Sequence, residues 1–265
     1  QMQLPAPSEG HHPGESGASC LEYLLRGAEC VPPSMGVFLP TTFRMHPALC
    51  TLVSDLSYRG LLMPHPCTVQ RAIELPSGRP APLLTRGVGV TFVPVRHDGN
   101  AQSSSEEVHA IRHLCDELLS GDAMFVDGAT RRPMTPEDIL VVAPYNLQVR
   151  ALEAALPSGV RAGTVDRFQG QEAPVVVLSL CHSDFQPTAA AADAAAVNEG
   201  GTAASAGGGS ERGLSFVLNP NRLNVALSRA QCLAVVVGSP RLADTSPKTL
   251  QQQRELNVLC RIMEE

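Results

Sequence analysis

The stretch Gly163-Thr-Val-Asp-Arg-Phe-Gln-Gly-Gln-Glu172 lies between two apolar segments. Residues 160–162 precede it, and the continuous apolar run 174–180 follows it. A run of this kind is typical of a parallel strand that is buried on both faces. Gly170 permits either a positive φ or a close approach of the backbone. The stretch is therefore predicted to be a loop that joins two strands of a buried sheet.

Two other segments carry arginines next to apolar runs. They are Phe43-Arg-Met-His-Pro47 and Asn221-Arg-Leu-Asn-Val-Ala-Leu-Ser-Arg-Ala230. Arg222 and Arg229 are seven positions apart, so a helix over 222–230 would place them on one face. A guanidinium stays charged and can bind phosphate oxygens in a bidentate manner. Arg44 and Arg229 are thus candidates for phosphate binding, at the rim of the sheet where α/β proteins form their sites.

The rest of the chain alternates between predicted strands and helices. The strands are expected at 36–39, 88–95, 139–143, 160–162, 174–180 and 232–238, and the helices at 19–26, 47–58, 103–119, 146–156, 222–230 and 249–263. This alternation predicts an α/β fold with a parallel sheet flanked by helices. Residues 63–87 are expected to be irregular, and 120–138 to form a loop or small hairpin. Residues 186–213 are predicted to be a flexible Ala/Gly-rich insertion.

Composition limits the class of protein. The 265 residues are 43% hydrophobic, and because they include no apolar run of about 18 residues, no membrane span is expected. Eight cysteines without a C-x-x-C pair indicate reduced thiols in a cytoplasmic protein. The histidines have no metal-ligand spacing, so no metal site is expected from this chain alone. A net charge of −6 argues against a uniformly basic nucleic-acid binder but allows a local basic groove.

Taken together, the three motifs resemble motifs IV, V and VI of superfamily 1 helicases. More narrowly, the chain resembles the C-terminal RecA-like domain of the AAA_12 type found in superfamily 1B. The resemblance implies the second motor domain of a RecA-like P-loop NTPase fold over residues 36–265, preceded by a lead-in segment at 1–35. No Gly-x-x-x-x-Gly-Lys-Ser/Thr loop occurs in the sequence. The phosphate cradle and the Mg²⁺ ligands are therefore expected on a missing N-terminal RecA-like domain.

The same resemblance implies roles around ATP. Arg44 and Arg229 would be catalytic arginine fingers, which are arginines that reach a phosphate bound by another domain. The segment Gln1-Met-Gln-Leu-Pro5 is similar to the tail of motif III, and its third residue would sense the γ-phosphate. Nucleotide-binding roles are implied for Gln3, Phe43, Gly170, Glu172 and Arg222.

Single-stranded nucleic acid is the second implied ligand. By resemblance, Thr164 would touch its backbone, while Asp166 and Gln169 would couple this contact to the nucleotide. Ala143-Pro-Tyr-Asn-Leu-Gln148 ends one predicted strand and opens a helix. There Tyr145 and Asn146 could meet the bound strand through aromatic stacking. A plain turn with a helix cap is the alternative at this position.

A still narrower resemblance is to bacterial proteins that fuse a RecB-like nuclease to this helicase type. It rests on His12-Pro-Gly-Glu-Ser-Gly-Ala-Ser-Cys-Leu-Glu-Tyr-Leu-Leu25 and Leu227-Ser-Arg-Ala-Gln-Cys-Leu233. It favours DNA over RNA as the substrate and suggests a role in DNA repair. The alternatives are an RNA helicase of the same group and a non-catalytic nucleic-acid-binding scaffold. Retention of Arg44, Glu172 and Arg229 together favours the motor.

Overall fold

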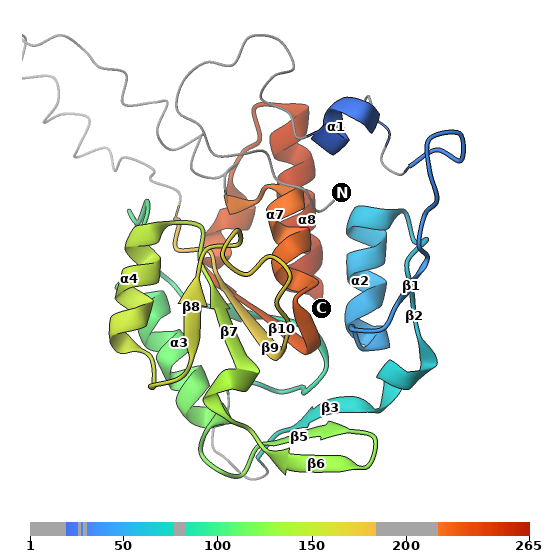
Figure 1. The fold of residues 1–265 in the computed structure, drawn as a ribbon. Helices are drawn as coiled ribbons and strands as arrows, with labels where there is room; N and C mark the ends of the chain where they lie inside the picture. Colours follow the sequence, from blue (N-terminus) through green and yellow to red (C-terminus); the bar gives the residue numbers. More distant parts are fainter. Residues whose placement is uncertain (1–19, 26–27, 29–30, 77–82, 184–216) are drawn as a thin grey trace, which may run out of the picture.

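A five-stranded parallel sheet forms the centre of the molecule (Figure 1). The computed structural model describes residues 20–25, 28, 31–76, 83–183 and 217–265. Within them the central sheet has the order β4 (Gly89–Pro94), β10 (Ala230–Gly238), β9 (Ala173–Ser179), β7 (Ile139–Val142) and β8 (Arg161–Gly163). Every neighbouring pair is parallel. All strands therefore begin at one edge, here called the amino edge, and end at the other, the carboxyl edge.

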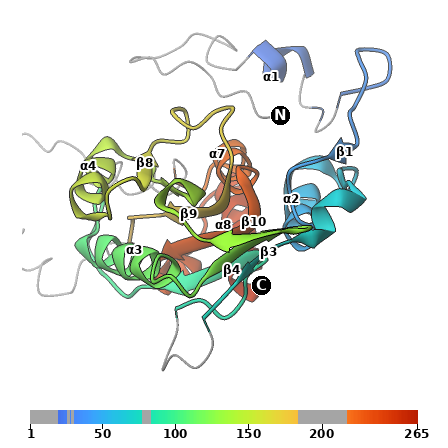
Figure 2. The ribbon, with the colours of Figure 1, turned by 60° about the horizontal axis from the view of Figure 1, so that its bottom comes forward.

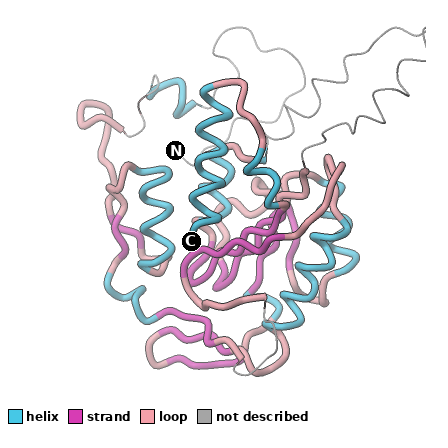
Figure 3. The backbone as a smooth tube through the Cα atoms, turned by 180° about the vertical axis from the view of Figure 1, so that it is seen from behind, coloured by secondary structure: helices cyan, strands magenta, loops and turns pink. Residues whose placement is uncertain are grey.

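Helices cover both faces of this sheet (Figures 1 and 3). One face packs against α2 (Pro47–Tyr58), α7 (Pro220–Leu227) and α8 (Leu250–Glu264). The other packs against α3 (Ser105–Leu118) and α4 (Asn146–Ala155), which lie side by side in Figure 2. Successive strand residues point to opposite faces, so Leu140 joins the first cluster and Val141 the second. This explains why the strands are apolar at nearly every position.

Smaller elements extend one side of the sheet. A two-stranded parallel pair joins β1 (Thr41–Thr42) and β2 (Met63–Pro64). A three-stranded antiparallel sheet joins β3 (Arg71–Glu74), β5 (Met124–Asp127) and β6 (Thr130–Pro133). The short helices are α1 (Cys20–Leu25) and the 3₁₀ turns η1 (Pro66–Gln70), η2 (Pro136–Asp138) and η3 (Pro240–Asp244).

Local capping chemistry sets the ends of the helices that approach the candidate site. In α2 the ring nitrogen Nδ1 of His46 accepts a hydrogen bond from the Ala48 amide, and Pro47 occupies the first turn, where its missing N–H has no helical partner. The Asn219 side chain accepts from the amides of Asn221 and Arg222 and so begins α7. These caps fix the backbone directly after Arg44 and directly before Arg222.

Most predicted elements are confirmed within one or two residues. The exceptions are informative. Residues 36–39 form no strand, and the pairing occurs instead at Thr41–Thr42. Residues 63–87, expected to be irregular, contain β2, η1 and β3. The insertion predicted at 186–213 lies outside the described residues. The proposed division into a lead-in at 1–35 and a domain at 36–265 stays a prediction.

No helix among the described residues combines the length and the apolarity needed to cross a lipid bilayer.

Candidate functional site

Three motifs meet at the amino edge of the sheet. The Phe43–Pro47 and Asn221–Ala230 segments both approach the end of the Gly163–Glu172 stretch there. Glu172 immediately precedes β9, and Arg229 immediately precedes β10. Arg44 lies in the turn between β1 and α2. The amide of His46 donates to the carbonyl of Gln231 at 2.8 Å, which ties this turn to the start of β10. We call Arg44, Glu172, Ser228, Arg229 and Gln231 the arginine cluster.

An irregularity in β10 helps to build the arginine cluster. The pairing of β10 with β9 shifts register between Ala230 and Leu233, so the β10 side carries one extra residue. Such a bulge re-aims side chains at a strand end. Here Gln231 donates from Nε2 to Glu172 Oε1 at 2.9 Å, while its carbonyl accepts from His46.

Arg44 is held by two acceptors of different kinds. Its Nε donates to Glu172 Oε2 at 2.5 Å, and its Nη1 donates to the carbonyl of Ser228 at 2.9 Å. Its side chain is 27% exposed, so solvent or a ligand can still reach it. Partial burial would raise the pKa of Glu172, but the hydrogen bonds from Arg44 and Gln231 and the charge of Arg44 hold that pKa below its ordinary value.

Arg71 on β3 supports the turn that carries Arg44. Its Nη1 donates to the carbonyls of Phe43 at 2.8 Å and Arg44 at 2.7 Å. Its Nε donates to Asp127 Oδ2 on β5 at 3.1 Å. The sequence reasoning missed this residue because it falls in the segment expected to be irregular, and no local signal identifies it.

Arg229 is nearly buried, with 5% of its surface exposed. Its Nε donates to the Val225 carbonyl at 3.0 Å, its Nη1 to the Gln171 carbonyl at 3.3 Å, and its Nη2 to Ser228 Oγ at 3.4 Å. Burial first, and then the positive charge of Arg44, lower the pKa of the Arg229 guanidinium. A second cation beside this buried guanidinium creates a place where an anion is stabilised.

Arg222 does not belong to the arginine cluster. Helix α7 ends at Leu227, so Arg229 lies beyond it and the expected shared helix face is wrong. Burial lowers the pKa of Arg222, while the charges of Asp166 and Tyr145 act in the opposite direction. These neighbours follow the ends of β8 and β7, so Arg222 approaches the carboxyl edge and Arg229 the amino edge.

The residues predicted to meet nucleic acid lie at the carboxyl edge. Thr164 directly follows β8, Tyr145 precedes the first residue of α4, and Asn146 is that first residue. Asn146 is exposed, whereas Tyr145 is half-buried against the first hydrophobic cluster. The side chain of Tyr145 makes no capping hydrogen bond to α4. Tyr145 nevertheless occupies the N-cap position of α4, so the plain turn with a helix cap stays an open alternative to a nucleic-acid contact here.

Residues 164–172, here called the motif loop, connect the two edges. They leave the carboxyl end of β8 and reach the amino end of β9. Val165 and Phe168 are buried in the first hydrophobic cluster. A Cβ added at Gly163 would lie 2.8 Å from Arg167 Cδ and 3.0 Å from the Phe168 ring, so the loop folds closely over this glycine. Backbone bonds from Arg167 to Thr164 and from Gln171 to Phe168 close successive turns at 3.1 and 3.0 Å. Val165 and Phe168 thus anchor the loop to the core, while most of its other residues are exposed.

This arrangement corrects one expectation about the rim. The arginines were expected where strands end, which is the usual ligand edge of an α/β sheet. Arg44 does follow β1, but the central strands β9 and β10 begin, and do not end, at the arginine cluster. Arg44, Glu172 and Arg229 lie at the amino edge, whereas Thr164, Tyr145, Asn146 and also Arg222 lie toward the carboxyl edge.

Comparison with known families identifies the fold. A profile of the family AAA_12, described as an AAA domain, matches residues 17–241. The chain belongs to the AAA_12 family. The AAA_12 domain accordingly has the RecA-like α/β fold, and its parallel sheet with two helix layers is the observed form of it.

Curated relatives of the AAA_12 domain are much longer proteins. An uncharacterized ATP-dependent helicase, C05C10.2, of Caenorhabditis elegans is 26% identical over 208 residues, which is 76% of this chain and 11% of that protein. A regulator of nonsense transcripts 1 homolog of Drosophila melanogaster is 23% identical over 77% of this chain and 15% of its own length. ATP-dependent helicase NAM7 of Saccharomyces cerevisiae is 26% identical over 77% of this chain and 18% of its own length. The chain therefore spans less than a fifth of these three relatives.

Three further residues of the AAA_12 domain were predicted to contact the nucleotide, and they are Phe43, Gly170 and Gln3. Phe43 is 61% exposed and stacks on His65, with ring centroids 4.3 Å apart. Gly170 has φ +86°, and a side chain there would meet no atom within 4 Å. Of the two reasons considered for this glycine, the left-handed backbone is therefore the one that applies. Gln3 lies outside the described residues.

A buried network at the carboxyl edge was missed. Glu107 is fully buried and pairs with His97 Nε2 at 2.8 Å. It also accepts from Ser179 Oγ at 2.6 Å and from the Cys181 amide at 2.9 and 3.0 Å. Gln148 donates to the same Ser179 hydroxyl at 2.9 Å. Glu107 lies in the first turn of α3, where an acidic residue is common, and nothing in the nearby sequence signals a buried pair.

The donor set of the AAA_12 domain fits the phosphates of ATP better than a metal. Guanidinium groups donate only and suit phosphate oxygens. Within the described ranges, no group of three His, Cys, Asp or Glu side chains is placed to hold a metal ion. Arg44 and Arg229 are the guanidinium groups of this site whose chemistry fits phosphate oxygens.

Proposed function

We propose that this chain is the C-terminal motor domain of an ATP-dependent helicase or translocase of superfamily 1B. The observation that carries the proposal is the meeting of Arg44, Glu172 and Arg229 at one edge of the sheet. In this proposal an N-terminal RecA-like domain of the same polypeptide supplies the phosphate cradle and the Mg²⁺ ligands. Supporting it, the relatives named above include ATP-dependent helicases.

The chemistry assigned to the arginine cluster is electrostatic. ATP supplies the phosphoryl group, and hydrolysis spreads negative charge over its equatorial oxygens. Arg229 is prepositioned by three acceptors and needs little reorganisation to meet that charge. Arg44 brings a second guanidinium oriented by Glu172 and Ser228. An arginine finger contributes about 10³–10⁵ in rate in related NTPases.

We assign single-stranded nucleic acid to the carboxyl edge. Thr164 and Asn146 are accessible there, and Tyr145 offers an aromatic ring next to them. Stacking of one base on such a ring contributes about 1–3 kcal/mol. Arg222 lies near Tyr145 and Asp166, so we reassign it from the nucleotide to this edge. The motif loop would then couple the two sites, so that binding of nucleic acid at one edge changes the hydrolysis of ATP at the other.

DNA is the substrate we favour, on the motifs that resemble nuclease–helicase fusion proteins, and a RecB-like nuclease in the same polypeptide is part of that proposal. RNA is the second candidate, because one of the relatives named above is a regulator of nonsense transcripts 1 homolog. The two are separated by comparing a thymidine and a uridine oligonucleotide of equal length as activators of the full-length ATPase.

The first prediction distinguishes the isolated chain from the full-length protein. The purified 265-residue chain is expected to hydrolyse no ATP, because its sequence has no Walker loop to cradle the β- and γ-phosphates. The full-length protein is expected to hydrolyse ATP, faster with single-stranded nucleic acid. Phosphate release measured for both proteins tests this. Turnover by the isolated chain that disappears on Arg229→Ala would contradict the divided site, and an inactive full-length protein would contradict the motor.

The second prediction concerns coupling through the motif loop. In the full-length protein, Thr164→Ala is expected to leave basal ATPase near wild type and to weaken stimulation by single-stranded nucleic acid. The reason is that Thr164 lies at the carboxyl edge, far along the loop from the arginine cluster. ATPase rates measured against oligonucleotide concentration, beside a thermal melt, provide the test. A lowered melting temperature with unchanged stimulation would make Thr164 a structural cap.

A further inference from the structure

Arg161 connects the edge strand β8 to the end of the motif loop. It begins β8, and its Nη1 donates to the side-chain oxygen Oε1 of Gln171 at 2.8 Å. Its Nη2 donates to the Glu137 carbonyl at 3.0 Å. The Nε atom is buried and has no hydrogen-bond partner in the described part of the chain. The contacts of Nη1 with Gln171 and of Nη2 with the Glu137 carbonyl therefore set the orientation of this guanidinium.

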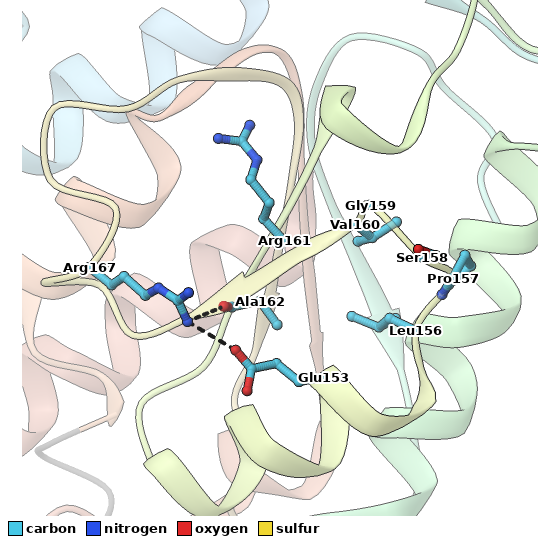
Figure 4. A pocket seen from close by; sticks show the side chains of 9 residues that line it. All are labelled: Glu153, Leu156, Pro157, Ser158, Gly159, Val160, Arg161, Ala162 and Arg167. Atoms are coloured by element: carbon cyan, nitrogen blue, oxygen red, sulfur yellow. Dashed lines mark hydrogen bonds and ion pairs between the residues drawn. The ribbon is translucent and has the colours of Figure 1, made fainter.

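Arg167 lies near Arg161, but its side chain has different partners. Arg161 and Arg167 both line a surface pocket of about 290 Å³. Figure 4 shows that the two guanidinium groups diverge: Arg167 turns to Glu153 and the Ala162 carbonyl, and Arg161 extends away from them. The two side chains therefore have separate partners although they share one pocket.

Gln171 is the residue at which the motif loop meets Arg229. Its carbonyl accepts from Arg229 Nη1 at 3.3 Å. Its side chain is held at both ends, because Oε1 accepts from Arg161 and Nε2 donates to the Arg167 carbonyl at 3.2 Å. The other carbonyl on Arg229 comes from Val225 of α7, the helix directly before it. Of these two carbonyl contacts, the one from Gln171 is thus the one that belongs to the motif loop.

We infer that Arg161 and Gln171 are positioning residues that set the guanidinium of Arg229 and transmit the state of the motif loop to it. The inference rests on the proposed ATPase function. It adds Arg161, which lies outside the three motifs, and a role for Gln171, to which the resemblance assigned none. Arg161 fixes the Gln171 side chain, and the fixed residue presents its carbonyl to Arg229. Loss of the first contact lets that carbonyl shift, and small misplacements of a catalytic group are amplified in the rate.

The test uses the full-length protein with saturating single-stranded nucleic acid. Arg161→Ala and Gln171→Ala are each expected to lower kcat for ATP by about 10- to 100-fold, with little change in KM. The double variant should be no worse than either single one, since both break the same contact. Arg161→Lys should recover part of kcat. The lysine ammonium can still donate to Gln171, although the contact with the Glu137 carbonyl is lost. Arg167→Ala is the matched control and should resemble wild type.

Wild type and Arg229→Gln are measured in the same series. Equal turnover of these two would refute the proposed role of Arg229. It would also remove the basis of the proposed link from Arg161 through Gln171 to Arg229, here called the relay. A large fall of kcat in Arg229→Gln, together with wild-type kcat in both Arg161→Ala and Gln171→Ala, would overturn the relay alone. A fall of kcat in Arg167→Ala as large as that in Arg161→Ala would also overturn the relay alone. If a thermal melt shows that Arg161→Ala is unfolded, Gln171→Ala and Arg161→Lys decide the result, because both keep most of the local packing.

Discussion

Replacing Arg229 with glutamine in the full-length protein is expected to lower kcat for ATP hydrolysis by about 10³-fold or more. Glutamine can still donate a hydrogen bond toward the carbonyls of Val225 or Gln171, which Arg229 contacts at 3.0 and 3.3 Å. It removes the charge that would meet the transferred phosphoryl group. The loss is therefore expected in kcat, with binding of ATP much less affected. Phosphate release under nucleic-acid stimulation measures it.

Arg229→Ala and Arg229→Lys complete this experiment. The buried position of Arg229 means that alanine also leaves carbonyl acceptors unmet, so its effect on the melting temperature must be measured beside its rate. Lysine keeps the charge but cannot reproduce the three-nitrogen contact pattern, and should recover little activity. Wild-type hydrolysis by Arg229→Gln would remove this residue from the chemistry.

Replacing Arg44 with alanine is expected to lower kcat by about 10²- to 10³-fold. Arg44 is partly exposed and bonded to an exposed carboxylate, so its loss should change folding stability little. Lysine should again rescue poorly, because Arg44 uses Nε for Glu172 and Nη1 for the Ser228 carbonyl. A single ammonium cannot occupy both directions in the same way.

Glu172 provides the paired test of this site. Glu172→Ala removes the acceptor shared by Arg44 and Gln231, so it is expected to depress basal and stimulated ATPase alike. This differs from Thr164→Ala, which should affect stimulation alone. Basal and stimulated rates measured for both variants distinguish the two ends of the motif loop. Wild-type rates for Arg44→Ala, or a normal basal rate for Glu172→Ala, would contradict the arrangement proposed for the arginine cluster.

The elements that the sequence identified are those whose burial leaves a local pattern. The runs at 139–143 and 174–180 became β7 and β9 because strands buried on both faces are apolar at nearly every position. Helix α2 was recognisable from Pro47 and its spaced leucines. The run at 36–39 misled because Val37 and Leu39 are exposed and pair with no strand. Hydrophobicity over so few residues does not distinguish a strand from an exposed segment.

The sequence by itself determined the fold class and the motifs that meet at the arginine cluster, since local periodicity and specific residue strings are properties of the chain alone. Only the tertiary structure decided which edge each residue occupies. Helix α7 ends before Arg229, so Arg222 and Arg229 lie with different neighbours. The contacts of Arg71 with the Arg44 turn and of Glu107 with Ser179 and Cys181 likewise join segments far apart in sequence. Such pairings depend on strand order and register, which are fixed by packing of the whole sheet and leave no signal at the residues themselves.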